Sequence, residues 1–143
     1  MSMGRGWSTK QLKGSVEALR KSVNVYNNTL EDILNDPVLL EIFRSAIIKN
    51  FEMAYGQCWD FMYWWLNFNV SPHIVRGVSY REFYEIACEN CLIEDIHTWC
   101  EFHEAVKQVL TVYEKDVATK VFQKAIEFLV YAENFCLRVK NMI

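Results

Sequence analysis

The chain has 143 residues, of which 52% are hydrophobic and 15% aromatic, and one domain of this size buries roughly 68–70% of its unfolded surface. Only 5 glycines and 2 prolines are present, which argues against a turn-dense β fold because hairpin corners need these residues. The net charge of −3 provides no excess of basic side chains, so nucleic acid is not expected as a partner.

The cysteines and the first residues indicate a protein of the reducing cytoplasm. The cysteines form an odd set, and no apolar leader precedes them. They are Cys58, Cys88, Cys91, Cys100 and Cys136. Residues 1–7 are expected to be a disordered or cloning-derived extension of one domain spanning 1–143. No membrane association is expected, because charged side chains such as Lys49 and Asp60 interrupt the most apolar segment.

The first predicted helix begins at a capping-box pattern, Ser8 to Gln11. Its apolar residues recur at alternating steps of four and three, which is typical of a helix with one buried stripe. That stripe consists of Leu12, Val16, Leu19, Val23, Tyr26 and Leu30. Asp36 and Pro37 are predicted to be the N-cap and first residue of the next helix.

The second predicted helix, from about Pro37 to about Leu66, has the most unusual composition. Residues 47–65 include seven aromatic side chains and a single glutamate, Glu52. The apolar positions cover more than the ~100° stripe of an ordinary surface helix. This helix is therefore expected to pack on two sides, in the interior of a bundle and at a subunit interface.

Three further helices follow. A second capping-box pattern at Ser79 predicts a short helix to about Cys91, and longer helices are predicted from about Asp95 and Asp116. The stripe of the first long helix is Ile96, Trp99, His103, Val106, Leu110 and Tyr113, and that of the second is Val121, Ala125, Phe128, Ala132, Phe135 and Val139. The expected fold is all-α, an antiparallel up-and-down four-helix bundle with one additional short helix.

Three stretches of the chain resemble the nucleotidyltransferase substrate-binding family, over about residues 15–140. They are Ile47-Ile48-Lys49-Asn50-Phe51-Glu52 with Tyr55 and Trp59, Ser79-Tyr80-Arg81-Glu82-Phe83-Tyr84-Glu85-Ile86-Ala87 with Leu92-Ile93, and Trp99 with Tyr113. Members are small helical bundles that accompany a separate minimal nucleotidyltransferase, and they are related to HepT-type toxins of the HEPN group. The resemblance implies a homodimer that binds this enzyme.

The toxin members of toxin–antitoxin pairs carry Arg-x-x-x-x-His-x-Tyr, a motif tied to ribonuclease activity. Aligned on Tyr113, this motif places Val106 at the arginine and Thr111 at the histidine. Valine carries no charge for phosphate, and threonine is a poor general acid or base near neutral pH. The chain is therefore expected not to be an enzyme itself. The resemblance also implies that Tyr113 is a candidate site of modification by the partner.

A cleft that contacts a ligand or the partner enzyme has six candidate residues. They are Asn50, Glu52, Tyr55, Trp59, Trp99 and His103. Glu52 is either such a contact or a helix-edge carboxylate that bonds a neighbouring aromatic or reaches solvent. His103, a lone histidine on an apolar face, is either catalytic or a satisfied core side chain.

No cofactor or metal site is expected. The three histidines are dispersed, and Cys88-x-x-Cys91 lacks a second pair of ligands at zinc spacing. The aromatic residues of the second helix lack the flanking lysines and arginines of a single-strand binding platform, which favours packing.

The leading hypothesis is a non-catalytic accessory subunit of a two-component nucleotidyltransferase system. One alternative is a HEPN-type ribonuclease that uses other residues, such as Glu52, His103 and Tyr113. Another is a groove-binding module for a planar, nucleotide-like ligand.

Overall fold

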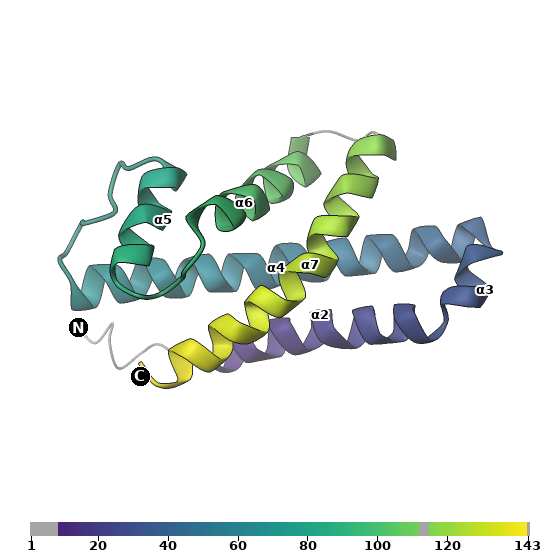
Figure 1. Ribbon diagram of the computed structural model, residues 1–143, viewed down its shortest axis with the longest axis horizontal. Coiled ribbons are helices and arrows are strands. Elements are labelled where there is room, and N and C mark those ends of the chain that lie inside the picture. The colour runs from purple at the N-terminus through teal and green to yellow at the C-terminus, as the bar shows by residue number, and fades with distance from the viewer. Residues whose placement is uncertain (1–8, 112–114, 143) are drawn as a thin grey trace.

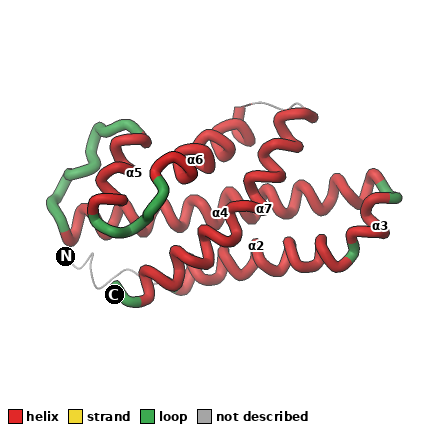
Figure 2. Tube along the Cα trace, in the orientation of Figure 1, coloured by secondary structure: helices red, strands yellow, loops and turns green. Residues whose placement is uncertain are grey.

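The computed structural model describes residues 9–111 and 115–142, and in this part of the chain all regular secondary structure is helical (Figures 1 and 2). Its elements are α2 (Lys10–Asn28), α3 (Leu30–Leu34), α4 (Pro37–Asn69), α5 (Tyr80–Glu89), α6 (Ile96–Thr111) and α7 (Lys115–Lys140). The long helices α2, α4, α6 and α7 alternate in direction along the chain (Figure 1). The predicted all-α bundle is confirmed.

The first predicted helix continues through Leu30, whereas the structure divides this segment into two helices. The first helix ends at Asn28, and α3 follows as a separate short helix after Thr29. The Thr29 N–H bonds to the carbonyls of both Val25 and Tyr26, and its hydroxyl donates to Val25 O at 2.7 Å. A threonine hydroxyl competes with the helix for the same carbonyl, and this favours a break at that residue.

The helix starts follow the predicted caps at two places. The Asp36 carboxylate accepts bonds from the N–H groups of Val38 and Leu39, at 3.1 and 3.2 Å, and Pro37 is the first residue of α4. Ser79 and Glu82 form the expected capping box at the start of α5. The predicted cap at Ser8 lies outside the described residues, and α2 begins after Thr9, whose side chain makes no capping bond.

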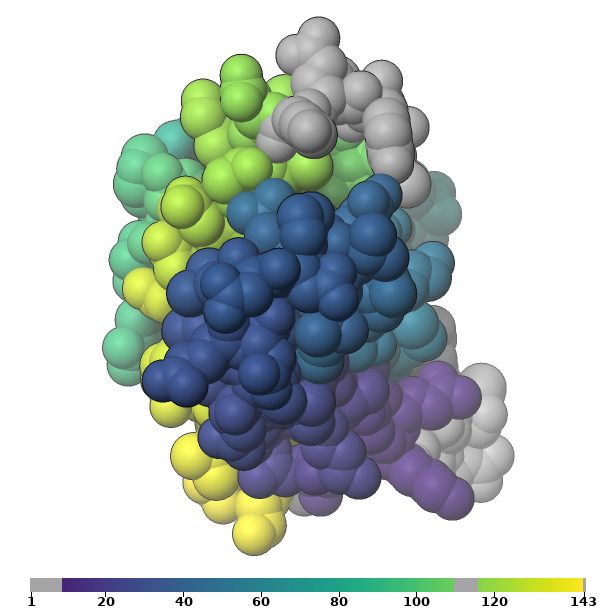
Figure 3. Space-filling view, turned by 90° about the vertical axis from the view of Figure 1, so that its right-hand side faces the viewer, coloured from purple at the N-terminus to yellow at the C-terminus, as the bar shows by residue number. Residues whose placement is uncertain are grey.

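The core is built around α4, which lies against α2, α3, α6 and α7. In Figure 1, α7 crosses α4 and α6 lies beside it, while α2 runs antiparallel to α4. Figure 3 looks onto the end of the molecule where α3 joins α2 to α4. The predicted stripe of α7 is confirmed in full, since its six residues are all buried. Four residues of the predicted α2 stripe are buried as well: Leu12, Val16, Leu19 and Val23.

The buried face of α6 differs from the predicted stripe. Phe102 and Ala105 are buried, whereas the predicted His103 and Val106 are only half-buried. The cause is that α6 packs against α5 on one side and α7 on the other, which turns the row through Phe102 toward the core. Tyr113 lies outside the described residues.

None of the described helices is long and apolar enough to cross a membrane. No group of three or more potential metal-ligating side chains gathers within residues 9–111 and 115–142. The five cysteines are all free thiols.

Candidate functional site

A buried chain of hydrogen bonds connects three helices on one side of α4. The hydroxyl of Tyr55, on α4, bonds to the hydroxyl of Tyr84, on α5. The same Tyr55 hydroxyl lies 2.7 Å from Nδ1 of His103, on α6. Tyr84 is fully buried and Tyr55 nearly so. Their hydroxyl groups therefore need these bonds as their hydrogen-bond partners.

Two aromatic rings pack against the imidazole of His103. The Tyr80 ring stacks on one face, with centroids 4.2 Å apart and planes 17° from parallel. The Trp59 ring lies 5.4 Å away at 37° and stacks in turn on Phe83 at 3.8 Å. His103 thus lies among aromatic rings at the edge of the core.

The surroundings of these groups favour their neutral forms. Burial raises the pKa of Tyr55 and of Tyr84 well above the ordinary value for a phenol. Burial, together with the nearby Lys107 ammonium, lowers the pKa of His103, while Glu104 opposes this shift. At neutral pH His103 is therefore an uncharged imidazole.

One arrangement of protons satisfies every hydrogen bond among Tyr84, Tyr55 and His103. A neutral His103 with its proton on Nε2 accepts at Nδ1 from Tyr55, and Tyr55 accepts from Tyr84. The reverse order would leave the Tyr84 hydroxyl proton without an acceptor, because Tyr55 is the only described group that bonds to it. An unmade bond of a buried donor costs about 1–3 kcal/mol, so the first arrangement is preferred.

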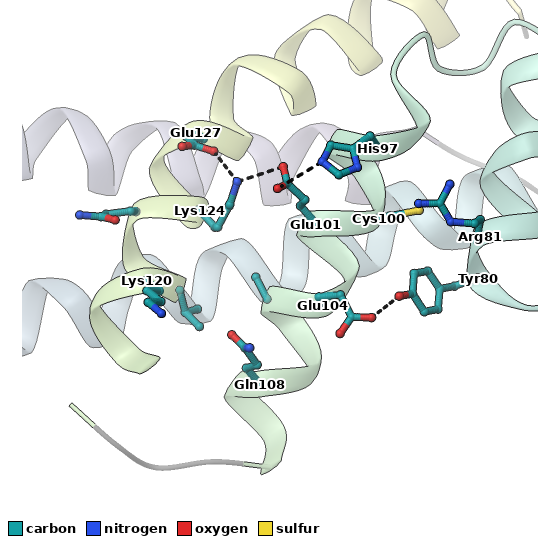
Figure 4. Close-up of a pocket in the computed structure, with 13 residues that line it drawn as sticks. Tyr80, Arg81, His97, Cys100, Glu101, Glu104, Gln108, Lys120, Lys124 and Glu127 are labelled. Carbon is teal, nitrogen blue, oxygen red and sulfur yellow. Dashed lines mark hydrogen bonds and ion pairs between the residues drawn. The ribbon is translucent and has the colours of Figure 1, made fainter. Parts of the chain in front are cut away.

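An open groove of about 430 Å³ adjoins this chain of bonds, between α6 and α7 with the start of α5 at its edge (Figure 4). Tyr80 forms part of its wall, and its hydroxyl donates to the Glu104 carboxylate. That bond, first among the causes, raises the pKa of Tyr80. The Tyr80 ring thus separates the groove from His103.

The groove carries charges of both signs. Lys124 bonds to Glu101 and Glu127, each at 3.2 Å. Burial lowers the pKa of Lys124, but the bonds to Glu127 and Glu101 outweigh it and raise the pKa overall. Arg81 and Lys120 line the groove without an ion pair to a described residue. The groove therefore offers two uncommitted cations beside the aromatic face of Tyr80.

The structure brings together three of the six candidate residues, Tyr55, Trp59 and His103. Trp99 is buried beside them, with its ring 5.9 Å from that of Tyr84. Asn50 lies elsewhere: its amide donates to Ala18 O at 3.3 Å and contacts Ser22 Oγ at 3.2 Å, so it joins α4 to α2.

Glu52 is half-buried and makes no hydrogen bond or ion pair with a described residue. None of the six candidates lines the groove of Figure 4.

Tyr80 and Tyr84 belong to the site but were not among the candidate residues. Both lie in the stretch that carries the family resemblance, four residues apart on one face of a short helix. That spacing was the available signal. It does not distinguish these tyrosines from core residues, because tyrosines at helical spacing are more often buried in the core.

Comparison with known proteins identifies the family. No curated protein and no solved structure matches the chain. Residues 8–141 match the family described as "Nucleotidyltransferase substrate binding protein like". This match covers nearly the whole chain, and it includes every residue of the site above. The chain therefore belongs to this family of proteins like the nucleotidyltransferase substrate-binding protein.

Proposed function

We propose that this protein is the accessory, substrate-binding subunit of a two-component nucleotidyltransferase system. In this proposal it performs no chemistry itself and acts as a homodimer that binds a separate nucleotidyltransferase. The observation that carries the proposal is the family match over residues 8–141. Nucleotide transfer needs metal-binding carboxylates and a phosphate-cradling Gly-Ser turn, whereas the Gly-Ser pair of this sequence, Gly14-Ser15, lies within helix α2.

The groove between α6 and α7 is the proposed contact for the substrate. Its size suits a small polar molecule. Arg81 and Lys120 supply positive charge for an anionic group, and Tyr80 supplies an aromatic face for a ring. The carboxylates of Glu101, Glu104 and Glu127 add acceptors for hydroxyl or amine groups.

The geometry around His103 favours this proposal over a ribonuclease. A general acid or base must reach its substrate directly or through one water. Here Nδ1 is bonded to Tyr55, and the rings of Tyr80 and Trp59 pack against the imidazole. The basic nitrogen of the neutral ring is thus engaged within the protein, which supports a positioning role for His103.

Co-purification from the native host tests the proposal. The chain is expected to retain a separate nucleotidyltransferase, and that enzyme is expected to transfer nucleotide faster to its substrate when the chain is present. Arg81→Gln should reduce the acceleration, whereas Arg76→Gln, at an exposed arginine outside the groove, should leave it unchanged. Failure to bind any nucleotidyltransferase would overturn the proposal.

A further inference from the structure

The face of α4 that points away from the core carries an ordered stripe. Seven of its residues recur at alternating steps of four and three, and we call them the outer stripe. They are Ile42, Ala46, Lys49, Met53, Gly56, Asp60 and Tyr63. All seven are exposed or half-buried. A repeat of this kind over several turns is the pattern by which one helix packs along another.

The outer stripe is more apolar than a solvated face requires. Ile42, Met53 and Tyr63 expose 59%, 55% and 41% of their surfaces. Because the opposite side of α4 already packs into the core, the helix has apolar residues on two sides. Such a second apolar face on a monomer marks an interaction surface.

When two copies of the outer stripe are placed antiparallel, the residues that then face each other are complementary. Lys49 and Asp60 are equally distant from the midpoint of residues 54 and 55, so they have opposite charges at mirrored positions. Met53 and Gly56 also mirror each other, as do Ala46 and Tyr63. In both of these pairs a large side chain mirrors a small one.

The two charged residues of the stripe have no counter-charge among the described residues. Neither Lys49 nor Asp60 forms an ion pair with a described residue. Partial burial raises the pKa of Asp60, and no cation among the described residues offsets this shift.

The packing of the described residues does not require a glycine at position 56. A glycine within a helix is destabilising relative to alanine. A Cβ added at Gly56 would meet nothing within 4 Å, so no described element of the same chain needs the space. A glycine at the centre of this stripe would allow a second helix to approach closely.

We propose that two copies of this chain associate through their outer stripes, with the two α4 helices antiparallel about a two-fold axis beside the midpoint of residues 54 and 55. In this register Lys49 lies opposite the partner's Asp60, and Met53 covers the partner's Gly56. Ala46 makes room for the partner's Tyr63. A two-fold axis forms each of these contacts twice, which is how a self-complementary patch closes a dimer.

This inference rests on the homodimer of the proposed function and specifies its interface. The two proposals are tested by different measurements, so one can be wrong while the other stands. Self-association is measured on the purified chain alone, whereas binding of the nucleotidyltransferase is measured in a mixture. A monomer that still binds the enzyme would overturn the register and leave the accessory role in place.

Charge exchange at the two mirrored positions tests the register. Lys49→Glu places two carboxylates opposite each other, and Asp60→Lys places two ammonium groups opposite each other. Each variant should raise the dimer dissociation constant at least tenfold in sedimentation equilibrium. The double variant Lys49→Glu/Asp60→Lys restores both pairs and should return the constant to near the wild-type value. An equimolar mixture of the two single variants should form heterodimers, since every charged contact is then complementary.

Two control variants separate the interface from general effects. Lys140→Glu makes the same charge change at an exposed position of α7 and should leave dimerisation unchanged. Gly14→Ala, at the other helical glycine with open space around it, should also leave it unchanged, whereas Gly56→Leu should weaken it. All these positions are exposed or half-buried, and circular dichroism confirms that the variants fold. A wild-type monomer, single variants that dimerise normally, or a double variant that does not recover would each overturn the register.

Discussion

The hydroxyl of Tyr55 lies 2.7 Å from Nδ1 of His103 and also bonds to the hydroxyl of Tyr84. This one phenol therefore joins the middle of α4 to both α5 and α6. It is the central member of a chain of three polar groups set in an otherwise aromatic core. Its position makes the three groups unequal in their contribution to stability.

Replacing Tyr55 by phenylalanine should be more destabilising than replacing Tyr84 by phenylalanine. Tyr55→Phe leaves the buried Tyr84 hydroxyl and His103 Nδ1 without their partner, a loss of about 1–3 kcal/mol in the free energy of unfolding. Tyr84→Phe removes the terminal donor and leaves no other hydrogen unpaired, so about 0.5–1.5 kcal/mol is expected. Urea denaturation of the two variants measures the order. A Tyr84→Phe variant as unstable as Tyr55→Phe would contradict the proton arrangement derived above.

The stability of the protein should fall at acidic pH through His103. Its pKa in the fold is lowered, chiefly by burial and next by Lys107, so folding favours the neutral ring. The stabilising contribution is fully present above the unfolded-state pKa of about 6.5 and is lost as pH falls through the lower folded-state value. Protonation would also force Nδ1 to donate to Tyr55 and would reverse the chain of bonds.

A matched variant separates the contribution of His103 to the pH dependence of stability from the contribution of the carboxylates. His103→Asn places a neutral amide near the position of Nδ1 and cannot take up a proton in this range. Between pH 8 and pH 5 the free energy of unfolding of His103→Asn should decline less than that of the wild type. Equal slopes for the two proteins would show that His103 does not contribute. Nitrogen-15 NMR of the ring should also find the proton on Nε2 at pH 8.

The extent to which the sequence predicts the fold varies from helix to helix, for a physical reason. The six residues of the α7 stripe are all buried as predicted. A neighbouring apolar row, which consists of Phe122, Ile126, Leu129 and Cys136, also packs against the core, because α7 lies against α2, α4 and α6. In α6, the residues Cys100 and Phe102 compete with the predicted row through His103 and Val106. Only the positions of α5 and α7 decide which row is buried, and periodicity carries no information about neighbours.

The site was predictable only in part. Tyr55, Trp59 and His103 were recognised singly, as residues of unusual type on apolar helices. Their contact depends on packing between residues 48 positions apart, which no spacing rule supplies. The groove was not predictable, since its charged side chains resemble an ordinary solvated face in the sequence.

Asn50 is expected to contribute to stability through the pairing of α4 with α2. Its amide donates to Ala18 O and contacts Ser22 Oγ. Asn50→Ala removes both contacts at a half-buried position and should lower the free energy of unfolding by about 0.5–1.5 kcal/mol. In a double-mutant cycle with Ser22→Ala, the two losses should not add, because one bond is shared. Strict additivity would show that the bond to Ser22 is not made in solution.

The aromatic centre of the bundle should be the part most sensitive to truncation. Phe128, on α7, is fully buried, and its ring centroid lies 4.9 Å from that of Phe102, 5.3 Å from Phe51 and 5.6 Å from Trp99. These neighbours come from α4 and α6, so the ring is surrounded by three helices and the site cannot easily collapse. Phe128→Ala should therefore cost about 3–5 kcal/mol.

Phe128→Leu retains most of the buried volume and should cost distinctly less than Phe128→Ala. Val130→Ala, at a residue of the same helix that is 59% exposed, should change the free energy of unfolding by no more than about 0.5 kcal/mol. Chemical denaturation of the three variants gives the ranking. If Phe128→Ala cost no more than Val130→Ala, α7 could not pack on α4 and α6 as the structure has it, because a ring in that position cannot be removed without leaving a cavity.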